Sequence, residues 1–173
     1  MDSHVTRPLS VKELQAALAL ELDESEFDED NMPDEELLTS LCARLVVIEE
    51  ESNLVRLVHY TTEEFFQRCR TTRFPRAHKI IALHCITYLS YDVFAEELCV
   101  DETTMSLRGA IYSLLFYAAK NWGHHVRVAP EKFVVEQVLE LFKRPSVTQS
   151  PFQALQHPEY SHRDYPGSTN NPP

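Results

Sequence analysis

The pattern of apolar and polar positions predicts two short strands near the middle of the chain. Residues 45–48 and 54–59 are rich in β-branched and apolar side chains, and the polar residues 49–53 between them can close a hairpin. Successive side chains of a strand point to opposite faces, so His59 shares a face with two apolar residues of the second run. The pattern therefore places a histidine at the end of a hairpin strand.

A helix is predicted directly after this histidine. Thr61 and Glu64 have the spacing of a capping box, in which a hydroxyl and a carboxylate satisfy the free amides at a helix start. Phe65, Phe66 and Cys69 then recur at helical spacing and form an apolar stripe. We expect the hairpin and this helix to hold the histidine at their joint.

Two further helices are predicted upstream of the hairpin. Ser10 and Glu13 form another capping box, and Pro33 and Asp34 are typical of a helix start. The expected buried faces are Val11, Leu14, Ala17 and Leu18 on the first helix, and Leu37, Leu38, Leu41 and Cys42 on the second. Helix, loop, helix and hairpin follow one another in the order of a winged-helix domain.

Downstream, three amphipathic patterns predict a short helical bundle. They cover residues 77–91, 107–122 and 133–142, and Gly123 is the expected end of the second helix. Residues 92–105 are expected to be a loop with a short helical turn. The fold class predicted is therefore mainly α: a winged helix with a small β-hairpin, followed by a short helical bundle.

The composition changes near the C-terminal end, where Pro, Ser, Gln, His and Asn replace most aliphatic residues. Such a segment buries too little apolar surface to offset the entropy of ordering, which predicts disorder. The chain is expected to have three parts: a winged-helix subdomain over residues 7–70, a helical subdomain over 74–143 and a disordered tail over 144–173.

The net charge of −11 is unevenly distributed. Residues 21–51 contain 13 acidic residues and one arginine, whereas residues 56–79 contain six basic and two acidic residues. The two regions can attract each other, meet neighbouring domains or simply be solvated faces. Residues 21–36, with ten acids, are either a surface linker or an acidic docking surface for a basic partner domain.

A nucleic-acid-binding winged helix is an alternative that the charges disfavour. In such proteins the second helix lies in the major groove. Here that helix begins with Asp34, Glu35 and Glu36, and a net charge of −11 repels phosphates. We therefore expect no nucleic-acid partner.

The sequence contains no familiar catalytic, metal or cofactor motif. A phosphate-binding loop, H-E-x-x-H and G-x-S-x-G are all missing. His84 and Cys85 are adjacent on a predicted helix, so their side chains point about 100° apart. His124 and His125 lack a carboxylate or thiolate at ligand spacing. We expect no catalytic residue, no metal and no cofactor, and the chain is not expected to be an enzyme by itself.

The cysteines and the apolar runs bear on location. Scattered cysteines without a C-x-x-C pair indicate a reducing compartment. No apolar run approaches the roughly 18 to 20 residues that a membrane span needs, and no secretory signal is visible. We expect a cytoplasmic protein with no membrane partner.

Two segments carry a family resemblance. They are LVHYTTEEFF at residues 57–66 and YAAKNWGHH at residues 117–125, and the similarity extends over about residues 7–142. The chain resembles the winged-helix segment that follows the NACHT nucleotide-binding domain in fungal NACHT–ankyrin repeat proteins. That segment is also described as the GPI inositol-deacylase-type winged-helix domain.

The resemblance implies a regulatory module of a STAND-type signalling NTPase. Its partner would be a NACHT domain, in cis or in trans, with ankyrin repeats as a further neighbour. In related switches a histidine at the end of a wing strand reaches the phosphate of bound ADP, and His59 matches that position. The sequence has neither a phosphate-binding loop nor ankyrin repeats, so we expect a fragment or a stand-alone derivative of such a protein.

A third hypothesis is a stand-alone protein–protein interaction scaffold. Its contact surface would be an exposed aromatic face formed by Tyr112, Phe116 and Trp122.

Overall fold

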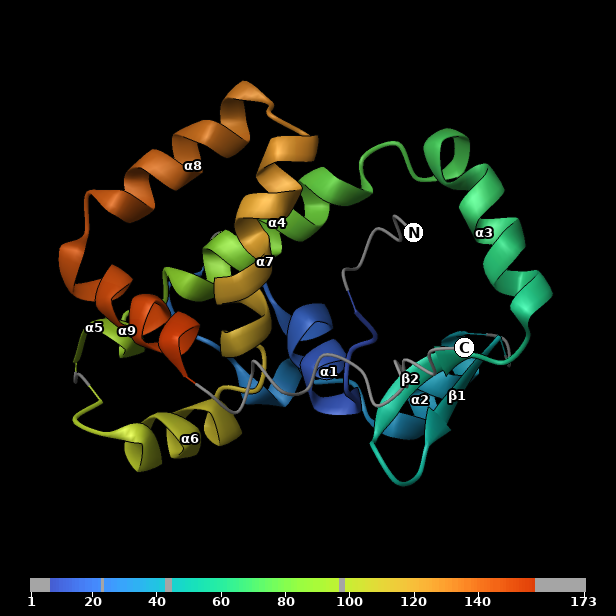
Figure 1. The fold of residues 1–173 in the computed structure, drawn as a ribbon, viewed down its shortest axis with the longest axis horizontal. Coiled ribbons are helices and arrows are strands. Elements are labelled where there is room, and N and C mark those ends of the chain that lie inside the picture. The colour runs from blue at the N-terminus through green and yellow to red at the C-terminus, as the bar shows by residue number, and fades with distance from the viewer. Residues whose placement is uncertain (1–6, 23, 43–44, 97–98, 158–173) are drawn as a thin grey trace, which may run out of the picture.

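The structure, a computed structural model, describes residues 7–22, 24–42, 45–96 and 99–157 of the chain. Helices dominate these residues and two strands form an antiparallel hairpin, which confirms the mainly α prediction (Figure 1). The elements are α1 (Val11–Ala19), η1 (Glu29–Asn31), α2 (Glu35–Leu41), β1 (Val46–Glu49), β2 (Leu54–Leu57), α3 (Tyr60–Arg73), α4 (Ala77–Leu89), α5 (Val93–Glu96), α6 (Glu102–Ile111), α7 (Leu115–Val128), α8 (Lys132–Phe142) and α9 (Pro145–Gln156).

Helix α1 begins at the predicted capping box but turns a different face inward. The Ser10 hydroxyl accepts a hydrogen bond from the Glu13 amide at 3.2 Å, and the Glu13 carboxylate accepts one from the Ser10 amide at 2.8 Å. Glu13 and Ala16 are buried, whereas Leu18 is exposed. The prediction that Leu18 would be buried is wrong, because an ion pair with Arg7 draws the Glu13 side of the helix inward.

Helix α2 buries less than its sequence predicts. The Asp34 carboxylate caps it by accepting a hydrogen bond from the Leu37 amide at 2.6 Å. Leu38 is buried, but Leu37 and Leu41 are 45% and 70% exposed. The predicted buried face is therefore wrong for these two leucines, and a short helix at the edge of the molecule leaves them on its surface.

The hairpin prediction is confirmed. Strand β1 pairs antiparallel with β2, with Val46 opposite Leu57 and Ile48 opposite Val55. Asn53 closes the turn with a left-handed backbone, φ 53°. Asparagine tolerates this conformation better than most residues, since its short polar side chain forms local hydrogen bonds.

Helix α3 follows the hairpin, but not through the predicted capping box. The helix begins at Tyr60 with His59 as its N-cap, and no side chain caps its first turn. Thr61 and Glu64 lie inside the helix, so the predicted pairing between them is wrong. No residue of α3 is buried, and the helix stands apart from α4 (Figure 1). On α3 the Phe66 ring packs against Phe65 and against Phe74, the residue that follows the helix.

The main core lies where α4 and α7 pack against each other, with α8 and α9 alongside (Figure 1). Tyr88 of α4, Phe94 of α5 and Leu115 of α7 are fully buried there. On the apolar face of α4, Cys85, Tyr88 and Leu89 are buried, whereas Ile80, near the start of the helix, is half exposed.

The long helix predicted over residues 107–122 is two helices. Helix α6 ends before Tyr112, whose backbone leaves the helical region with φ −99° and ψ 73°. The Tyr112 ring packs against Phe94 with centroids 5.2 Å apart. Tertiary packing therefore interrupts a pattern that is periodic on both sides of the break.

The two glycines inside the described helices have different surroundings, and the prediction made for Gly123 is wrong. Gly123 does not end α7, which continues to Val128. Gly109 lies against the Phe116 ring, and a Cβ atom at this position would be 1.9 Å from Phe116 Cε2. A glycine is therefore what allows α6 to approach the start of α7.

Part of the predicted disordered tail is a helix. Residues 145–156 form α9, and Val147 and Ala154 on it are buried. Pro145 occupies the first turn, where a missing N–H group is not needed. The disorder prediction is wrong for this part, because α9 buries one face, formed by Val147, Ser150, Pro151 and Ala154, and packs on α5 and α7. Residues 158–173 lie outside the described residues.

Candidate functional site

The hairpin is fixed to the start of the chain along its second strand. The Val55 amide donates to the Leu9 carbonyl at 2.8 Å, and the Val11 amide donates to the Asn53 carbonyl at 2.9 Å. These bonds bracket an isolated bridge between Ser10 and Leu54. Strand β2 is thus held along both edges, and the direction in which it leaves the sheet is fixed.

His59 lies between β2 and α3 as the sequence predicts, although the strand ends at Leu57, two residues earlier than predicted, and His59 is the N-cap of the helix. Its backbone is extended, with φ −128° and ψ 138°, and its carbonyl accepts from the Thr62 amide at 3.0 Å. The imidazole ring is exposed to solvent and makes no hydrogen bond within the described ranges. The ring is therefore available to a group outside the chain.

The start of α3 adds backbone donors next to this ring. The amides of Tyr60 and Thr61 find no acceptor among the described residues, because no side chain caps the helix. Free N–H groups and the helix dipole make such an end favourable for an anion. Together the imidazole and the two amides can donate hydrogen bonds to phosphate oxygens.

One carboxylate lies in the first turn of α3 beside this joint, and a second, at the turn end of the hairpin, pairs with the arginine of β2. Glu63 lies in the first turn of α3 and accepts from Gln67 at 3.0 Å, so its charge opposes anion binding. Glu49 of β1 pairs with Arg56 of β2, and the Ser52 hydroxyl lowers the pKa of its carboxyl. Arg56 is therefore already paired with a carboxylate.

Apolar side chains surround this joint on the surface. Val47 and Val58 of the hairpin region and Tyr60 at the start of α3 are all exposed, the last to 71%. Together with the exposed leucines of α2 they leave the N-terminal part of the molecule with much uncovered apolar surface.

Comparison with known families finds a match in the N-terminal part of the chain, which contains the hairpin and His59. Residues 1–71 match the family model described as GPI inositol-deacylase, winged helix domain. Over these residues the chain is similar to the winged-helix domains of this family. The match covers fewer than half of the 173 residues and ends within α3. No curated protein and no solved structure gives a significant match to the chain.

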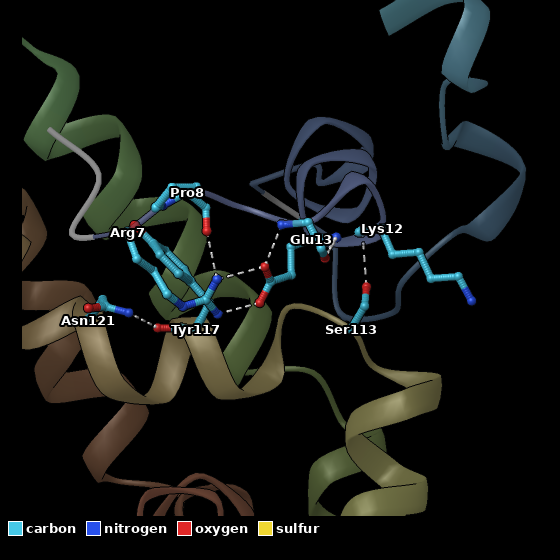
Figure 2. Close-up of polar contacts among 8 residues, drawn as sticks. Arg7, Pro8, Lys12, Glu13, Ser113, Tyr117 and Asn121 are labelled. Atoms are coloured by element: carbon cyan, nitrogen blue, oxygen red, sulfur yellow. Dashed lines mark hydrogen bonds and ion pairs between the residues drawn. The ribbon is translucent and has the colours of Figure 1, made fainter. Parts of the chain in front are cut away.

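The winged-helix domain is joined to the helices that follow it by a polar latch (Figure 2). Arg7 donates to both carboxylate oxygens of Glu13 at 2.9 and 2.5 Å, and its guanidinium lies 5.3 Å from the centroid of the Tyr117 ring of α7. Nearby, the Ser113 hydroxyl donates to the Lys12 carbonyl at 3.1 Å. We name Arg7, Glu13 and Tyr117 the latch. The sequence pattern does not indicate the latch, because the capping box with Ser10 already accounts for Glu13.

The pair His84 and Cys85 is separated as predicted. His84 Nδ1 donates to the Ile80 carbonyl at 2.8 Å, which is a bond within α4. Cys85 is buried in the core, and burial raises the pKa of its thiol to about 12. A thiol in this state is a poor nucleophile at neutral pH.

The structure brings a third histidine to His124 and His125. His78 of α4 lies 2.9 Å from His125 through their Nδ1 atoms, so one donates and the other accepts. The ring centroids of His78 and His124 are 5.8 Å apart. Within the described residues, no group of three or more His, Cys, Asp or Glu side chains has an arrangement that could hold a metal ion.

A serine–histidine contact was not predicted from the sequence. His157 Nε2 lies 3.1 Å from Ser106 Oγ and 3.2 Å from the Glu102 carbonyl oxygen. Because a carbonyl only accepts, Nε2 carries the proton and cannot act as a base toward Ser106. The contact ties the end of α9 to α6 and gives no nucleophile–base pair.

The aromatic face expected for a scaffold is not exposed. Phe116 is buried, Tyr112 packs on Phe94, and Trp122 packs on Phe142 with centroids 6.0 Å apart. That prediction is therefore wrong, because the break before α7 turns these rings toward the neighbouring helices. None of the helices in the described part of the chain is both long and apolar enough to span a membrane.

Proposed function

We propose that the chain is a non-catalytic regulatory module that packs on a NACHT-type nucleotide-binding domain of a STAND signalling NTPase in the cytoplasm. The partner domain would be supplied in cis or in trans. In this proposal His59 donates a hydrogen bond to a phosphate of the bound nucleotide. The observation that carries it is the free, exposed His59 ring beside the open amides of Tyr60 and Thr61.

The exposed apolar surface of the winged-helix domain supports packing on another domain. Leu41 and Tyr60 are 70% and 71% exposed, and Leu37, Val47 and Val58 are also exposed. Removing such surface from water stabilises a complex by about 25 cal/mol per Å² of apolar area before the costs of association. A partner domain that covers this surface would also bring its nucleotide to the wing.

The switching step follows from which nucleotide is bound. A contact between His59 and a phosphate is made only in the docked arrangement, so the nucleotide that presents its phosphate there favours docking. A hydrogen bond to a charged group contributes a net of about 1.5–3 kcal/mol, which corresponds to a change in affinity of about 10- to 150-fold. We assign the higher affinity for the partner domain to its ADP-bound state and the lower affinity to its ATP-bound state.

The nucleic-acid alternative gains no support from α2. Its cap and first turn consist of Asp34, Glu35 and Glu36, and this helix would enter the major groove of DNA in a DNA-binding winged helix. Three carboxylates there would repel the phosphate backbone.

Calorimetric titration of the chain into a separately expressed NACHT domain tests the proposal. We expect binding that is at least about tenfold tighter with ADP than with a non-hydrolysable ATP analogue. Leu41→Glu should weaken binding, whereas Leu107→Glu, which alters a leucine of α6 that is 60% exposed, should not. Equal affinity in the two nucleotide states would contradict the switching role, and no binding in either state would contradict the packing role.

A further inference from the structure

A groove opens at the other end of α3, where it meets α4. The cavity measures about 420 Å³, within the range of about 300–1,000 Å³ typical of ligand pockets. Its wall is apolar and is formed by Phe74, Ile80 and Ile81, and Arg73 and Arg76 also line it. Phe74 and Ile80 are each about half exposed, so no other part of the described chain covers the groove.

Two arginines line this groove, and these and two more arginines of α3 have no side-chain partner among the described residues. Arg68, Arg70, Arg73 and Arg76 make no ion pair or hydrogen bond through their side chains within the described residues. Lys79, which lies three residues after Arg76, pairs by contrast with Glu131. A chain with 27 acidic and 16 basic residues thus leaves two arginines, Arg73 and Arg76, unneutralised at an apolar cavity.

The helical spacing places part of this cluster on one face. Residues three or four apart lie on the same side of a helix, so Phe66, Arg70 and Arg73 share a face of α3. The Phe66 and Phe74 rings lie 6.0 Å apart and connect that face to the groove. The surface therefore combines aromatic side chains with guanidinium groups in one strip.

We infer that this groove binds an acidic segment of a partner protein, with an apolar side chain in the cavity and carboxylates on the arginines. Arginine suits carboxylates because its planar fork can donate two hydrogen bonds to one of them. A nucleic acid fits less well, since the wall is apolar and the net charge of −11 opposes a polyanion. The inference does not require a NACHT partner, because α3 separates the groove from His59 by about 20 Å at 1.5 Å per residue.

Fluorescence anisotropy with a defined probe tests the inference. The probe is a short labelled peptide of glutamates interrupted by leucine and phenylalanine, and the comparison peptide has serine in place of the apolar residues. We expect the probe to bind the full chain, to bind about tenfold more tightly than the serine peptide, and to weaken as salt increases.

Charge-reversal variants locate the binding. Arg73→Glu with Arg76→Glu should weaken the probe at least about tenfold. Lys12→Glu with Arg127→Glu makes the same change in net charge at two other exposed positions and should have little effect. Ile80→Ser should weaken binding of the probe without changing the salt dependence of that binding, because it removes part of the apolar wall and no charge.

Several outcomes would overturn the inference. Absence of binding, equal binding of the serine peptide, or equal weakening by both double variants would each exclude a groove that recognises acidic and apolar groups together. Tighter binding of a DNA duplex than of the probe would identify a nucleic-acid surface instead. A dimer seen by light scattering and dissolved by the Arg73→Glu, Arg76→Glu variant would assign the groove to a second copy of the chain.

Discussion

The same substitution should have opposite effects at the two helical glycines. Gly109 lies in α6 and Gly123 in α7, and each is inside its helix. Alanine is more favourable than glycine in a helix interior by about 1 kcal/mol. At Gly123 a Cβ atom would have no neighbour within 4 Å, so Gly123→Ala should stabilise the protein by about that amount.

At Gly109 the added methyl group meets an aromatic ring. The Cβ atom would be 1.9 Å from Phe116 Cε2 and 2.7 Å from Cζ, far inside the roughly 3.5–4.0 Å of a favourable carbon contact. Phe116 cannot move freely, because it is buried and packs against the His157 ring at 5.4 Å. Overpacking costs about 1–3 kcal/mol, and a contact this short belongs at the upper end.

The net effect of Gly109→Ala is the difference between these contributions. A cost of about 3 kcal/mol less a helix-propensity gain of about 1 kcal/mol leaves a destabilisation of about 2 kcal/mol. For a chain of this size 1 kcal/mol corresponds to about 2–4 °C in Tm. Gly109→Ala should therefore lower Tm by about 4–8 °C, and Gly123→Ala should raise it by about 2–4 °C.

Urea denaturation followed by circular dichroism measures both variants, and a second background tests the cause. If the Phe116 ring is responsible, adding Gly109→Ala to Phe116→Leu should cost much less than adding it to the natural sequence. A Gly109→Ala variant that is as stable as the natural protein, or more stable, would refute the close approach of α6 to α7. An unchanged cost in the Phe116→Leu background would refute the assignment to this ring.

Three further predictions test the latch, the buried thiol and α9. Glu13→Ala should destabilise the protein by about 3–5 kcal/mol, because it leaves the partly buried Arg7 guanidinium without its carboxylate. Lys12→Ala, on the exposed side of α1, should cost little stability. Thermal unfolding measures both variants. Burial raises the pKa of the Cys85 thiol from an ordinary 9.0 to about 12. Between these pH values the thiol is deprotonated in the unfolded chain but still protonated in the folded chain. The free energy of unfolding should therefore fall as pH rises from 9 to 12. Urea titrations across that range should show a shallower fall for Cys85→Ala, and an identical slope would contradict the burial of the thiol. A chain that ends at Lys143 should lose stability because it lacks buried Val147 and Ala154 of α9, and an unchanged unfolding midpoint would show that α9 does not pack as described.

The winged-helix part could be predicted because its signals are local. The Ser10–Glu13 cap, the hairpin and the position of His59 each depend on a few neighbouring residues, and the structure contains all of them. The cap of α3 was predicted wrongly, since Thr61 and Glu64 have suitable spacing but the helix begins one residue before Thr61. Spacing identifies a possible cap, whereas the hydrogen-bonded end of the strand decides where the helix starts.

The helical part could be predicted less well because distant contacts determine it. The break after α6 depends on Tyr112 reaching Phe94, and α9 is ordered by neighbours far away in the sequence. The contact between His78 and His125 joins residues 47 positions apart, which no local pattern indicates. The latch was hidden for a related reason, since Glu13 serves as both a helix cap and the partner of Arg7.

The role proposed for His59 is tested most directly by the rate at which ADP leaves a NACHT domain in complex with this chain. The measurement uses a fluorescent ADP analogue chased with unlabelled nucleotide. We expect the chain to slow dissociation of ADP, and we expect His59→Ala to speed it again by about tenfold or more while His84→Ala does not. Equal dissociation rates for the natural chain and His59→Ala, with the complex intact, would contradict a contact between His59 and the nucleotide.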